Sequence, residues 1–513
     1  MNTHLVRSLL TALARMGVAE VCVAAGARNA PIVAALTSSE GVKLWNFFEE
    51  RSAAFFAIGR ILADRAPVAV LTTSGTAAAE LLPAAVEAHY QGLPLVLITA
   101  DRPRRYRGTG APQAIEQKDL FGPYVSGCLD VEVGVSLSWP TRIGPRPLHI
   151  NICLDEPLAT NLNGIDFLAH HGPTAARPAA PPSYVLPSEP TAVIASGLTL
   201  SEAKEAAYVL DKLRLPILAE ATSNLWRLPE ADCLSTLLHE ASETALQSLN
   251  ARHILRLGGI PTARWWRDLE DRPDVQVTNI SRLAFPGLAR QEGVQTLPWT
   301  ALRTLPNHVL PPAIVACSTS DMEQALLSHP LSEPAWIREL ALAIPSGSRV
   351  FLGNSLPIRE FNLAAASIQP GVEFFANRGA NGIDGLVSTW LGVSAIVRES
   401  WLVLGDLSAM YDLAAPWIMP QLPAGNRRLV VINNGGGKIF SRVASLRHLS
   451  TQARHIIENR HRVTFAPWAE MWGLAYEQIT DPAQLLEIQD GPVLVEIMPD
   501  TVSTDAFYAA VKG

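Results

Sequence analysis

Two short polar segments contain residue types that bind metal ions, and each follows an apolar run. Gly405-Asp406 follows Trp401–Leu404, and Asn433-Asn434 with three glycines follows Leu429–Ile432. A carboxylate, a side-chain amide oxygen and a main-chain carbonyl oxygen are hard donors, which suit Mg²⁺ that keeps sites for phosphate oxygens and water. Glycines also let the main chain approach an anion closely. Together the segments predict a site for Mg²⁺ and phosphate, although a Gly-Asp alone is more often a strand-ending turn.

The apolar runs before these segments explain how the two could meet. Both runs are short, continuous and buried in character, which predicts parallel strands. The mostly apolar segment between them is long enough for one helix, so the whole stretch is a predicted right-handed strand–helix–strand unit. Its two strands should end side by side, at the edge of the sheet where open α/β folds bind ligands. We therefore expect Asp406 and Asn434 to lie close together.

A pair of acidic residues, Glu49 and Glu50, stands in a comparable position early in the chain. It follows a predicted strand, Leu44–Phe48, and precedes an alanine-rich predicted helix, Ser52–Ala63. From the local sequence alone, the favoured interpretation is that these acids stabilise the start of the helix through its dipole. A catalytic role for Glu50 depends on the resemblance to a known family, given below.

Strands and helices alternate along all 513 residues, which predicts an α/β fold of three αβ domains with parallel doubly wound sheets. We place the domains at residues 1–175, 190–328 and 335–513, with linkers at residues 171–192 and 328–334. The N-terminal residues and Ala77–Tyr90 are predicted helices. The predicted strands are Ala19–Ala25, Leu44–Phe48, Val68–Leu71, Leu95–Thr99, His149–Cys153, Pro216–Ala219, His253–Leu257, Val275–Asn279, Ile314–Cys317, Arg349–Leu352, Val372–Phe375, Trp401–Leu404, Leu429–Ile432 and Val493–Ile497.

The composition argues against several classes of function. The chain is 48% hydrophobic with a formal net charge of −7, which disfavours a general nucleic-acid binder. It has no apolar run of about 18 residues, so we expect no stable membrane insertion. The start of the chain lacks the core of a signal peptide. Five scattered cysteines predict reduced thiols in a cytoplasmic protein.

The two segments with potential metal ligands, Gly405–Leu407 and Asn433–Gly437, resemble the signature of the thiamine diphosphate enzyme family. That signature is Gly-Asp-Gly, followed after roughly twenty-five residues by Asn-Asn. Here 25 residues separate Leu407 from Asn433. The resemblance implies thiamine diphosphate as cofactor and Mg²⁺, or alternatively Mn²⁺, as metal. The implied metal ligands are Asp406, Asn434 and the carbonyl of Gly436.

The same resemblance assigns a catalytic role to Glu50. In this family a glutamate after the second strand bonds the aminopyrimidine ring nitrogen, and the 4-amino group in its imino form becomes the base. The first domain would bind the pyrimidine and the third the diphosphate. Further implied cofactor contacts are Ser74, Gly75, Ser355, Ile383, Gly405, Leu407, Ser408 and Ile439.

Other segments resemble one branch of the family, the 2-succinyl-5-enolpyruvyl-6-hydroxy-3-cyclohexene-1-carboxylate (SEPHCHC) synthases of menaquinone biosynthesis. Leu407, which replaces the usual glycine, is characteristic of that branch. The matching segments are Ala100–Pro103, Gln113–Ile115, Gly353–Leu356 with Arg359, Asn377–Gly385, Gly405–Leu413 and Gly437–Phe440.

This branch implies a transferase that decarboxylates 2-oxoglutarate and adds the resulting succinyl carbanion equivalent to isochorismate by conjugate addition. Both substrates are dicarboxylates, which arginine binds well through two parallel hydrogen bonds. The implied substrate-binding residues are Arg28, Arg102, Gln113, Arg264, Ser355, Arg359, Arg378, Ile439 and Phe440. The sequence departs from the branch at Ala27, Pro112 and Ala263, all on the substrate side.

In this family the active sites are shared between subunits, so the resemblance implies a homodimer or a homotetramer. Two other hypotheses stay open. The chain could be another thiamine diphosphate-dependent 2-oxoacid decarboxylase or carboligase of the acetolactate synthase type, which Leu407 and the arginines disfavour. It could also be a non-catalytic cofactor-binding αβ protein, which Glu50 disfavours because binding alone needs no such acid.

Overall fold

The computed structural model describes residues 2–134, 138–158, 163–170, 182–231, 237–238, 251–305, 320–365, 367–446 and 448–511. The described part contains three six-stranded sheets in which every paired strand is parallel. This confirms the predicted α/β fold with three parallel sheets. The chain forms two compact units, one made of Met1–Arg177, Gly379–Ile396 and Tyr411–Pro423 and the other of the remaining residues.

The first sheet has the strand order β2-β1-β3-β4-β6-β5. The chain runs outward from β1 to β2 in one direction and from β3 to β4 in the other, so the switch point lies between β1 and β3. Ligands of open α/β sheets bind at such a point. The strands of the first sheet and the helices of the same segment are α1 (Asn2–Arg15), β1 (Glu20–Ala24), α2 (Ala30–Thr37), β2 (Lys43–Phe47), α3 (Glu50–Asp64), β3 (Val68–Thr72), α4 (Thr76–Ala79), α5 (Leu82–Gln91), β4 (Leu95–Asp101), β5 (Cys128–Glu132) and β6 (Leu148–Cys153).

The second sheet has a different strand order, β12-β11-β10-β7-β8-β9, and its switch point lies between β7 and β10. One hydrophobic core continues from its strands into the third sheet, so both sheets belong to the same unit. Its elements are β7 (Thr191–Ser196), α6 (Leu200–Leu213), β8 (Ile217–Ala219), β9 (Leu237–Leu238), β10 (His253–Gly258), α8 (Arg264–Asp268), β11 (Gln276–Ser281) and β12 (Val294–Pro298).

The third sheet has the order β14-β13-β15-β16-β18-β17, and its switch point lies between β13 and β15. Strands β15 and β16 are neighbours, with Gly405 opposite Ile432, as the sequence predicted. The elements of this stretch of the chain are α9 (Ser320–Ser328), α10 (Glu333–Ala343), β13 (Arg349–Leu352), α11 (Leu356–Ala364), β14 (Glu373–Phe375), α12 (Leu386–Ser394), β15 (Glu399–Gly405), α13 (Asp406–Tyr411), β16 (Asn426–Ile432), α14 (Thr451–Glu458), α15 (Ala466–Trp472), β17 (Ala475–Ile479), β18 (Pro492–Ile497) and α16 (Thr501–Val511). Of these, α12 belongs to the first unit.

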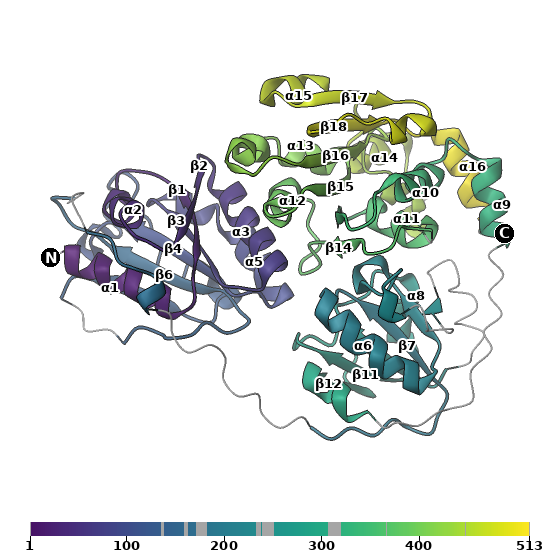
Figure 1. Cartoon of the computed structure of the whole chain (residues 1–513), viewed down its shortest axis with the longest axis horizontal. Helices are drawn as coiled ribbons and strands as arrows, with labels where there is room; N and C mark the ends of the chain where they lie inside the picture. Colours follow the sequence, from purple (N-terminus) through teal and green to yellow (C-terminus); the bar gives the residue numbers. More distant parts are fainter. Residues whose placement is uncertain are drawn as a thin grey trace. The chain divides into compact units, whose positions relative to one another are not determined.

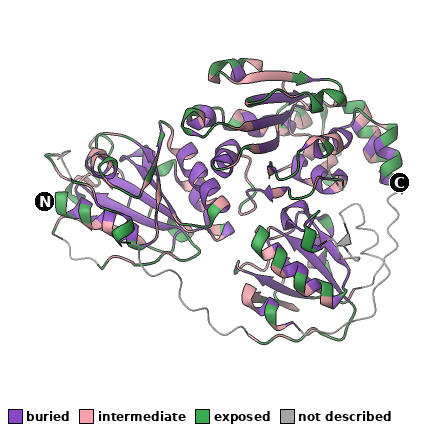
Figure 2. Cartoon of the chain, in the orientation of Figure 1, coloured by how far each residue is buried: buried purple, intermediate pink, exposed green. Residues whose placement is uncertain are grey.

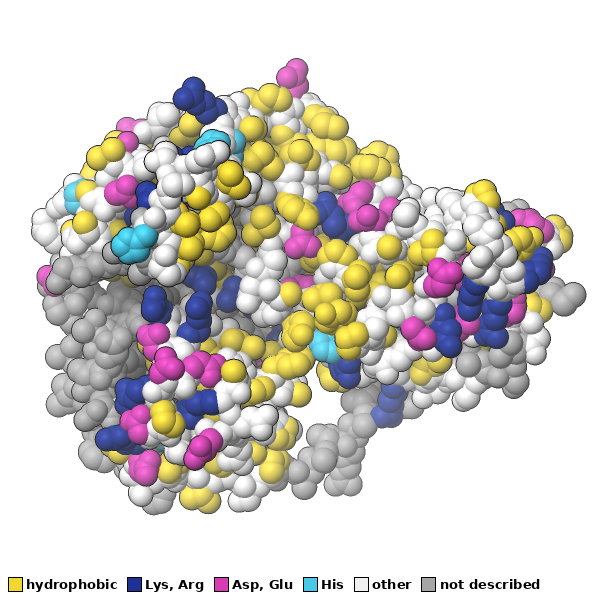
Figure 3. Space-filling model, turned by 180° about the vertical axis from the view of Figure 1, so that it is seen from behind, with side chains coloured by type: hydrophobic (Ala, Val, Ile, Leu, Met, Phe, Trp, Pro, Cys, Tyr) yellow, Lys and Arg dark blue, Asp and Glu magenta, His cyan; other side chains and the backbone are white. Residues whose placement is uncertain are grey.

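The ribbon views show how the layers are built. Helices flank the strands of each sheet (Figure 1), and the central strands are buried while the outer faces of the helices are exposed (Figure 2). On the face seen in Figure 3, acidic side chains lie among the lysines and arginines. None of the helices in the described part of the chain combines the length and apolar character needed to cross a bilayer.

Several elements differ from the sequence prediction. Ala77–Tyr90 forms two helices, α4 and α5, because Pro83 has no N–H and stands in the first turn of α5. The segment after Asp406 was predicted as one helix, but it forms the short α13 and a 3₁₀ helix, Ala415–Gln421, that contains two prolines. Thr191 and Ala192 belong to β7 and not to a linker. The sequence prediction missed β5, β7, β9, β12 and β17. The predicted strand Ile314–Cys317 lies outside the described residues.

Candidate active site

Asp406 follows β15 directly and is buried. Its Oδ1 accepts the N–H of Leu407 (2.6 Å), and its Oδ2 accepts the N–H groups of Gly435 (2.8 Å) and Gly436 (2.9 Å). Burial raises the pKa of Asp406, and these backbone donors act in the opposite direction. A carboxylate has about four acceptor positions, so one remains for a metal ion.

Asn434 lies at the end of the neighbouring strand, β16. Its Nδ2 donates to Oε2 of Glu333 (2.9 Å), while its Oδ1 is buried and has no hydrogen-bond partner among the described residues. A buried amide oxygen without a partner is costly unless a ligand or an ion satisfies it. The carbonyl of Gly436 accepts the N–H of Lys438 (2.8 Å), which leaves its second lone pair.

These three groups form the donor set of a hard divalent cation. Within the described residues, no cluster of three His, Cys, Asp or Glu side chains could hold a metal ion. Asn434 and Gly436 offer an amide oxygen and a carbonyl oxygen beside the Asp406 carboxylate. Gly436 has a φ of 133°, and a Cβ there would lie 2.5 Å from the carbonyl oxygen of Glu458, so no larger residue fits.

His461 is a neighbour of Asp406 that no sequence motif marked. Its Nδ1 accepts the N–H of Val463 (3.1 Å), so the proton of the neutral ring lies on Nε2. That nitrogen lies 3.2 Å from Oδ2 of Asp406. The Nε2–H group of His461 thus presents a partial positive charge to the buried carboxylate of Asp406.

Two buried glutamates, Glu333 and Glu360, lie behind Asn434. Burial raises the pKa of Glu333 to about 7. Burial and the neighbouring Glu333 carboxylate raise the pKa of Glu360 well above its ordinary value. Oε1 of Glu360 accepts the hydroxyl of Tyr508 (2.7 Å). No local sequence signal marks this pair, because Glu333 looks like an ordinary acid in the first turn of a helix.

The structure separates the roles of the two acids before α3. Glu49 is the N-cap, and its carboxylate accepts the N–H groups of Arg51 (3.0 Å) and Ser52 (2.8 Å) and the Ser52 hydroxyl. The half-buried Glu50 is the first residue of the helix, and no other described side chain donates a hydrogen bond to its carboxylate. Burial raises the pKa of Glu50, as do the nearby carboxylates of Glu49 and Glu80. Helix capping therefore accounts for Glu49 and leaves the Glu50 carboxylate available.

The turn after β3 carries Ser74, which is buried, and Gly75, which has a φ of 84°. The N–H of Gly75 donates to Oε1 of Gln117 (2.8 Å), whose Nε2 donates to Asn151 on β6 (2.9 Å). Gln117 is fully buried and holds this turn, yet the sequence prediction missed it. The predicted residue Gln113 is exposed, has a φ of 55° and packs against Gly75.

Two predicted substrate arginines lie at the carboxyl end of the first sheet. The buried Arg28 donates from Nη1 to the carbonyl of Leu154 (3.0 Å), and that nitrogen lies 3.4 Å from Glu156. Arg102 donates from Nε to the carbonyl of Pro112 (2.9 Å). Pro112, where the sequence departs from the branch, therefore still accepts a hydrogen bond from Arg102 through its main-chain carbonyl. Ala27 lies in the loop between β1 and α2, next to Arg28.

A second group of predicted residues gathers at the end of β13. Ser355 has a φ of 77°, and its carbonyl accepts Nη1 of Arg359 (3.4 Å). Nη1 of Arg378 donates to Oδ1 of Asn354 (2.8 Å). The structure thus brings Ser355, Arg359 and Arg378 together through Asn354, a residue of the Gly353–Leu356 motif to which no role was assigned.

Arg264 does not join that group through any contact in the described residues. Its side chain is 82% exposed and lies 3.6 Å from Asp268 on the same helix. The preceding Ala263 is buried, and its N–H donates to Oε1 of Glu220 (3.0 Å). Glu220 is fully buried, and burial raises its pKa, which the nearby Arg378 lowers in part.

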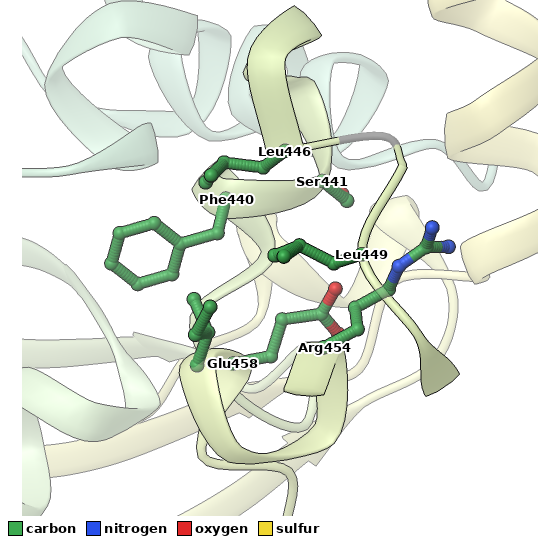
Figure 4. Close-up of a pocket in the computed structure, with 7 residues that line it drawn as sticks. Phe440, Ser441, Leu446, Leu449, Arg454 and Glu458 are labelled. Atoms are coloured by element: carbon green, nitrogen blue, oxygen red, sulfur yellow. The ribbon is translucent and has the colours of Figure 1, made fainter. Parts of the chain in front are cut away.

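The predicted substrate contacts Ile439 and Phe440 follow the three glycines at residues 435–437. Phe440 is 39% exposed and lines a cavity of about 40 Å³ with Leu446 and Leu449 (Figure 4). Ile439 precedes it in the same 3₁₀ helix, Lys438–Arg442, and is half-buried. Of the other predicted positions, Gly405 ends β15, Leu407 and Ser408 lie in the first turn of α13, and Ile383 lies in the loop before α12.

Comparison with known proteins identifies the family. Residues 3–120 match the family described as "Thiamine pyrophosphate enzyme, N-terminal TPP binding domain". The chain is 38% identical to a protein of Akkermansia muciniphila over 98% of this chain and 97% of that protein. It is 38% identical to one of Bdellovibrio bacteriovorus (99% and 98% covered) and 31% identical to one of Geobacillus kaustophilus (91% and 88% covered). All three are named 2-succinyl-5-enolpyruvyl-6-hydroxy-3-cyclohexene-1-carboxylate synthase. The chain belongs to this synthase family.

Membership of the SEPHCHC synthase family confirms the resemblance that the motifs indicated. Together with the match to the TPP binding domain, it makes the chain a thiamine diphosphate-dependent enzyme. The first sheet, whose loops carry Glu50, Ser74 and Gly75, lies largely within the matched residues 3–120.

Proposed function

We propose that the chain is a transferase that decarboxylates 2-oxoglutarate and adds the resulting succinyl carbanion equivalent to isochorismate, giving SEPHCHC and CO₂ in menaquinone biosynthesis. The observation that carries this proposal is the buried Asp406 carboxylate beside the partnerless amide oxygen of Asn434, in a chain 38% identical to two SEPHCHC synthases. A divalent cation held by Asp406 and Asn434 could also bind the phosphate oxygens of a diphosphate cofactor. The relatives are named for the product SEPHCHC, which supports this choice of product.

The proposed metal ligands are Asp406, Asn434 and the carbonyl of Gly436, with Mg²⁺ as the ion or Mn²⁺ in its place. Phosphate oxygens and a water molecule would complete its shell. The turn of Gly405, Leu407 and Ser408 would border the diphosphate, and the third sheet would form the diphosphate-binding domain. The first sheet would form the pyrimidine-binding domain, with Ser74 and Gly75 lining the cofactor. Ile383 and Ile439 would contribute apolar contacts to it.

Glu50 is the proposed catalytic acid. Bound thiamine diphosphate supplies the carbon nucleophile of the reaction. Glu50 would hold a proton at the aminopyrimidine ring nitrogen, which makes the exocyclic amino group a base. A raised pKa suits this role because it favours the protonated form.

The proposed substrate contacts are cationic and polar groups that suit dicarboxylates. Ser355, Arg359 and Arg378 already lie together, and Arg359 and Arg378 could each bind a carboxylate through two hydrogen bonds. The further proposed contacts are Arg28, Arg102, Gln113, Arg264, Ile439 and Phe440. Among these, Arg264 is the weakest because it is exposed and lies against Asp268.

We also propose that the active form is a homodimer or a homotetramer. Exposed apolar residues gather beside Glu50: Phe48 (55% exposed) stacks edge-on against Trp417, and Tyr411 (55% exposed) lies under the guanidinium of Arg51. Such a patch on a folded surface favours association with another chain. Sedimentation over a range of concentrations tests this, and a fully active monomer would contradict it.

The reaction is tested by mixing the purified protein with thiamine diphosphate, Mg²⁺, 2-oxoglutarate and isochorismate. We expect the absorbance of isochorismate to fall only when all components are present. If 2-oxoglutarate is decarboxylated while isochorismate stays constant, the chain is instead a thiamine diphosphate-dependent 2-oxoacid decarboxylase or carboligase with another acceptor.

A further inference from the structure

The side-chain amide of Asn434 has two different faces, and only one of them can bind a cation. Its oxygen can coordinate a metal ion, whereas its NH₂ group repels one. Rotation of the amide by half a turn exchanges the two with little change in shape. A site that uses Asn434 therefore needs a group that fixes which face points outward.

Glu333 is the group placed to do this. Its Oε2 accepts the hydrogen bond from Nδ2 of Asn434 at 2.9 Å, and in this arrangement no group in the described part of the chain bonds the buried Oδ1. If the amide were reversed, its oxygen would face the Glu333 oxygen and its NH₂ would occupy the position offered to the ion.

Glu333 is itself held in place by its surroundings. It is 2% exposed and opens helix α10, where its backbone N–H donates to Oγ1 of Thr504 on α16 (3.0 Å). Its carboxylate neighbours that of Glu360, which is in turn bonded by the hydroxyl of Tyr508. The backbone of Glu333 is thus anchored to α16, and its buried carboxylate accepts the bond from Asn434.

We propose that Glu333 is a positioning residue that holds the amide of Asn434 so that Oδ1 faces the divalent cation. This inference rests on the proposed function, because it assumes that Asn434 is a ligand of the cation. Groups that orient a metal ligand in this way typically change metal affinity by about 10- to 100-fold when they are replaced.

The test is the variant Glu333→Gln, which keeps the size of the side chain but can turn an NH₂ group toward Asn434. Mg²⁺ is titrated into the full-length metal-free protein with saturating thiamine diphosphate, and binding is followed by tryptophan fluorescence. We expect the Kd for Mg²⁺ to rise roughly 10- to 100-fold, while the melting temperature of the metal-free protein stays close to that of the wild type. At saturating Mg²⁺, turnover should recover.

The matched control is Glu360→Gln, which changes the neighbouring buried carboxyl but leaves the contact between Glu333 and Asn434 intact. We expect its Kd for Mg²⁺ to stay within a few-fold of wild type. An unchanged Kd in Glu333→Gln would overturn the inference, as would an equal loss in both variants. Failure of the wild type itself to bind thiamine diphosphate with Mg²⁺ would instead refute the proposed function.

Discussion

Asp406 and Gly436 are joined directly, because Oδ2 of Asp406 accepts the N–H of Gly436 at 2.9 Å. The two residues follow adjacent parallel strands, β15 and β16. The carboxylate therefore holds the glycine loop over the end of its own strand. Gly435 donates to the same oxygen at 2.8 Å. Asp406 is therefore bonded to the segment that carries the other two proposed metal ligands, Asn434 and Gly436.

Asp406→Ala should abolish Mg²⁺-dependent binding of thiamine diphosphate, because it removes a metal ligand and the acceptor for three backbone N–H groups. We expect calorimetry to show a loss of affinity of more than about 100-fold, at or beyond the upper end for residues that only orient a ligand. Asp490→Ala is the control, since this carboxylate is 93% exposed. Equal affinities for the wild type and Asp406→Ala would remove Asp406 from the site.

Glu50→Gln should keep cofactor binding and reduce turnover by about 10³-fold or more, because the amide cannot hold or release the proton at the ring nitrogen. Cofactor affinity by calorimetry and the steady-state kcat together separate binding from chemistry. Glu49→Gln is the matched control. It weakens the helix cap, which costs about 1 kcal/mol of stability, but should leave kcat within a few-fold of wild type. If Glu50→Gln turns over at the wild-type rate, Glu50 is not the catalytic acid.

Asp412 predicts a pH dependence of stability. It is fully buried, and burial raises its pKa to about 6, although Ser388 and Arg51 act in the opposite direction. Its pKa in the folded state exceeds that in the unfolded state, so the unfolded chain loses this proton first as the pH rises. The protonated Asp412 carboxyl therefore contributes about 3 kcal/mol to the free energy of unfolding when the pH is below the unfolded pKa. This contribution is lost as the pH rises from about 4 to about 6.

Comparison with Asp412→Asn isolates this effect, because the variant does not titrate there. We expect the free energy of unfolding of the wild type, relative to the variant, to fall over that range and to stay level above it. A difference that does not change with pH would show that the buried carboxyl keeps its ordinary pKa.

At the crossing of α3 and α12, Gly59 and Gly392 leave no room for a larger side chain. A Cβ at Gly59 would lie 2.0 Å from the carbonyl oxygen of Thr389, and one at Gly392 would lie 2.3 Å from that of Phe56. Because backbone atoms cannot give way, either Gly→Ala change should destabilise the protein by about 1–3 kcal/mol. Gly127→Ala, where a Cβ meets nothing within 4 Å, should change stability by less than about 0.5 kcal/mol. Thermal unfolding that is equal for all three variants would contradict the close packing.

Most of the strands that the sequence predicted are buried on both faces, and the partly exposed edge strand β2 is an exception. β3, β4 and β16 each contain a continuous apolar run and lie in the middle of their sheets, and the structure confirms them. β12 and β17 were missed because they are edge strands with partly exposed residues, so their sequences lack that pattern. The missed β7 is buried, but it follows a proline-rich segment that concealed its start.

At the site, residues in continuous motifs could be predicted, and residues that act from a distance could not. The neighbouring strand ends of Asp406 and Asn434 follow from the strand–helix–strand pattern. Gln117 and Glu333 could not be predicted, because each reaches its partner only through the tertiary fold, over 42 and 101 positions of the chain respectively. The local sequence placed both Glu49 and Glu50 at the helix start without separating them, and only the family resemblance favoured Glu50 as the catalytic residue; the structure shows that Glu49 is the cap.

The stoichiometry of the reaction tests the central proposal most directly. In one reaction vessel, the CO₂ released from 2-oxoglutarate and the isochorismate consumed are measured together, with thiamine diphosphate and Mg²⁺ present. We predict equal amounts of both, and no CO₂ release above background in the Asp406→Ala protein. Release of CO₂ by the wild type while isochorismate remains untouched would contradict the proposed synthase activity.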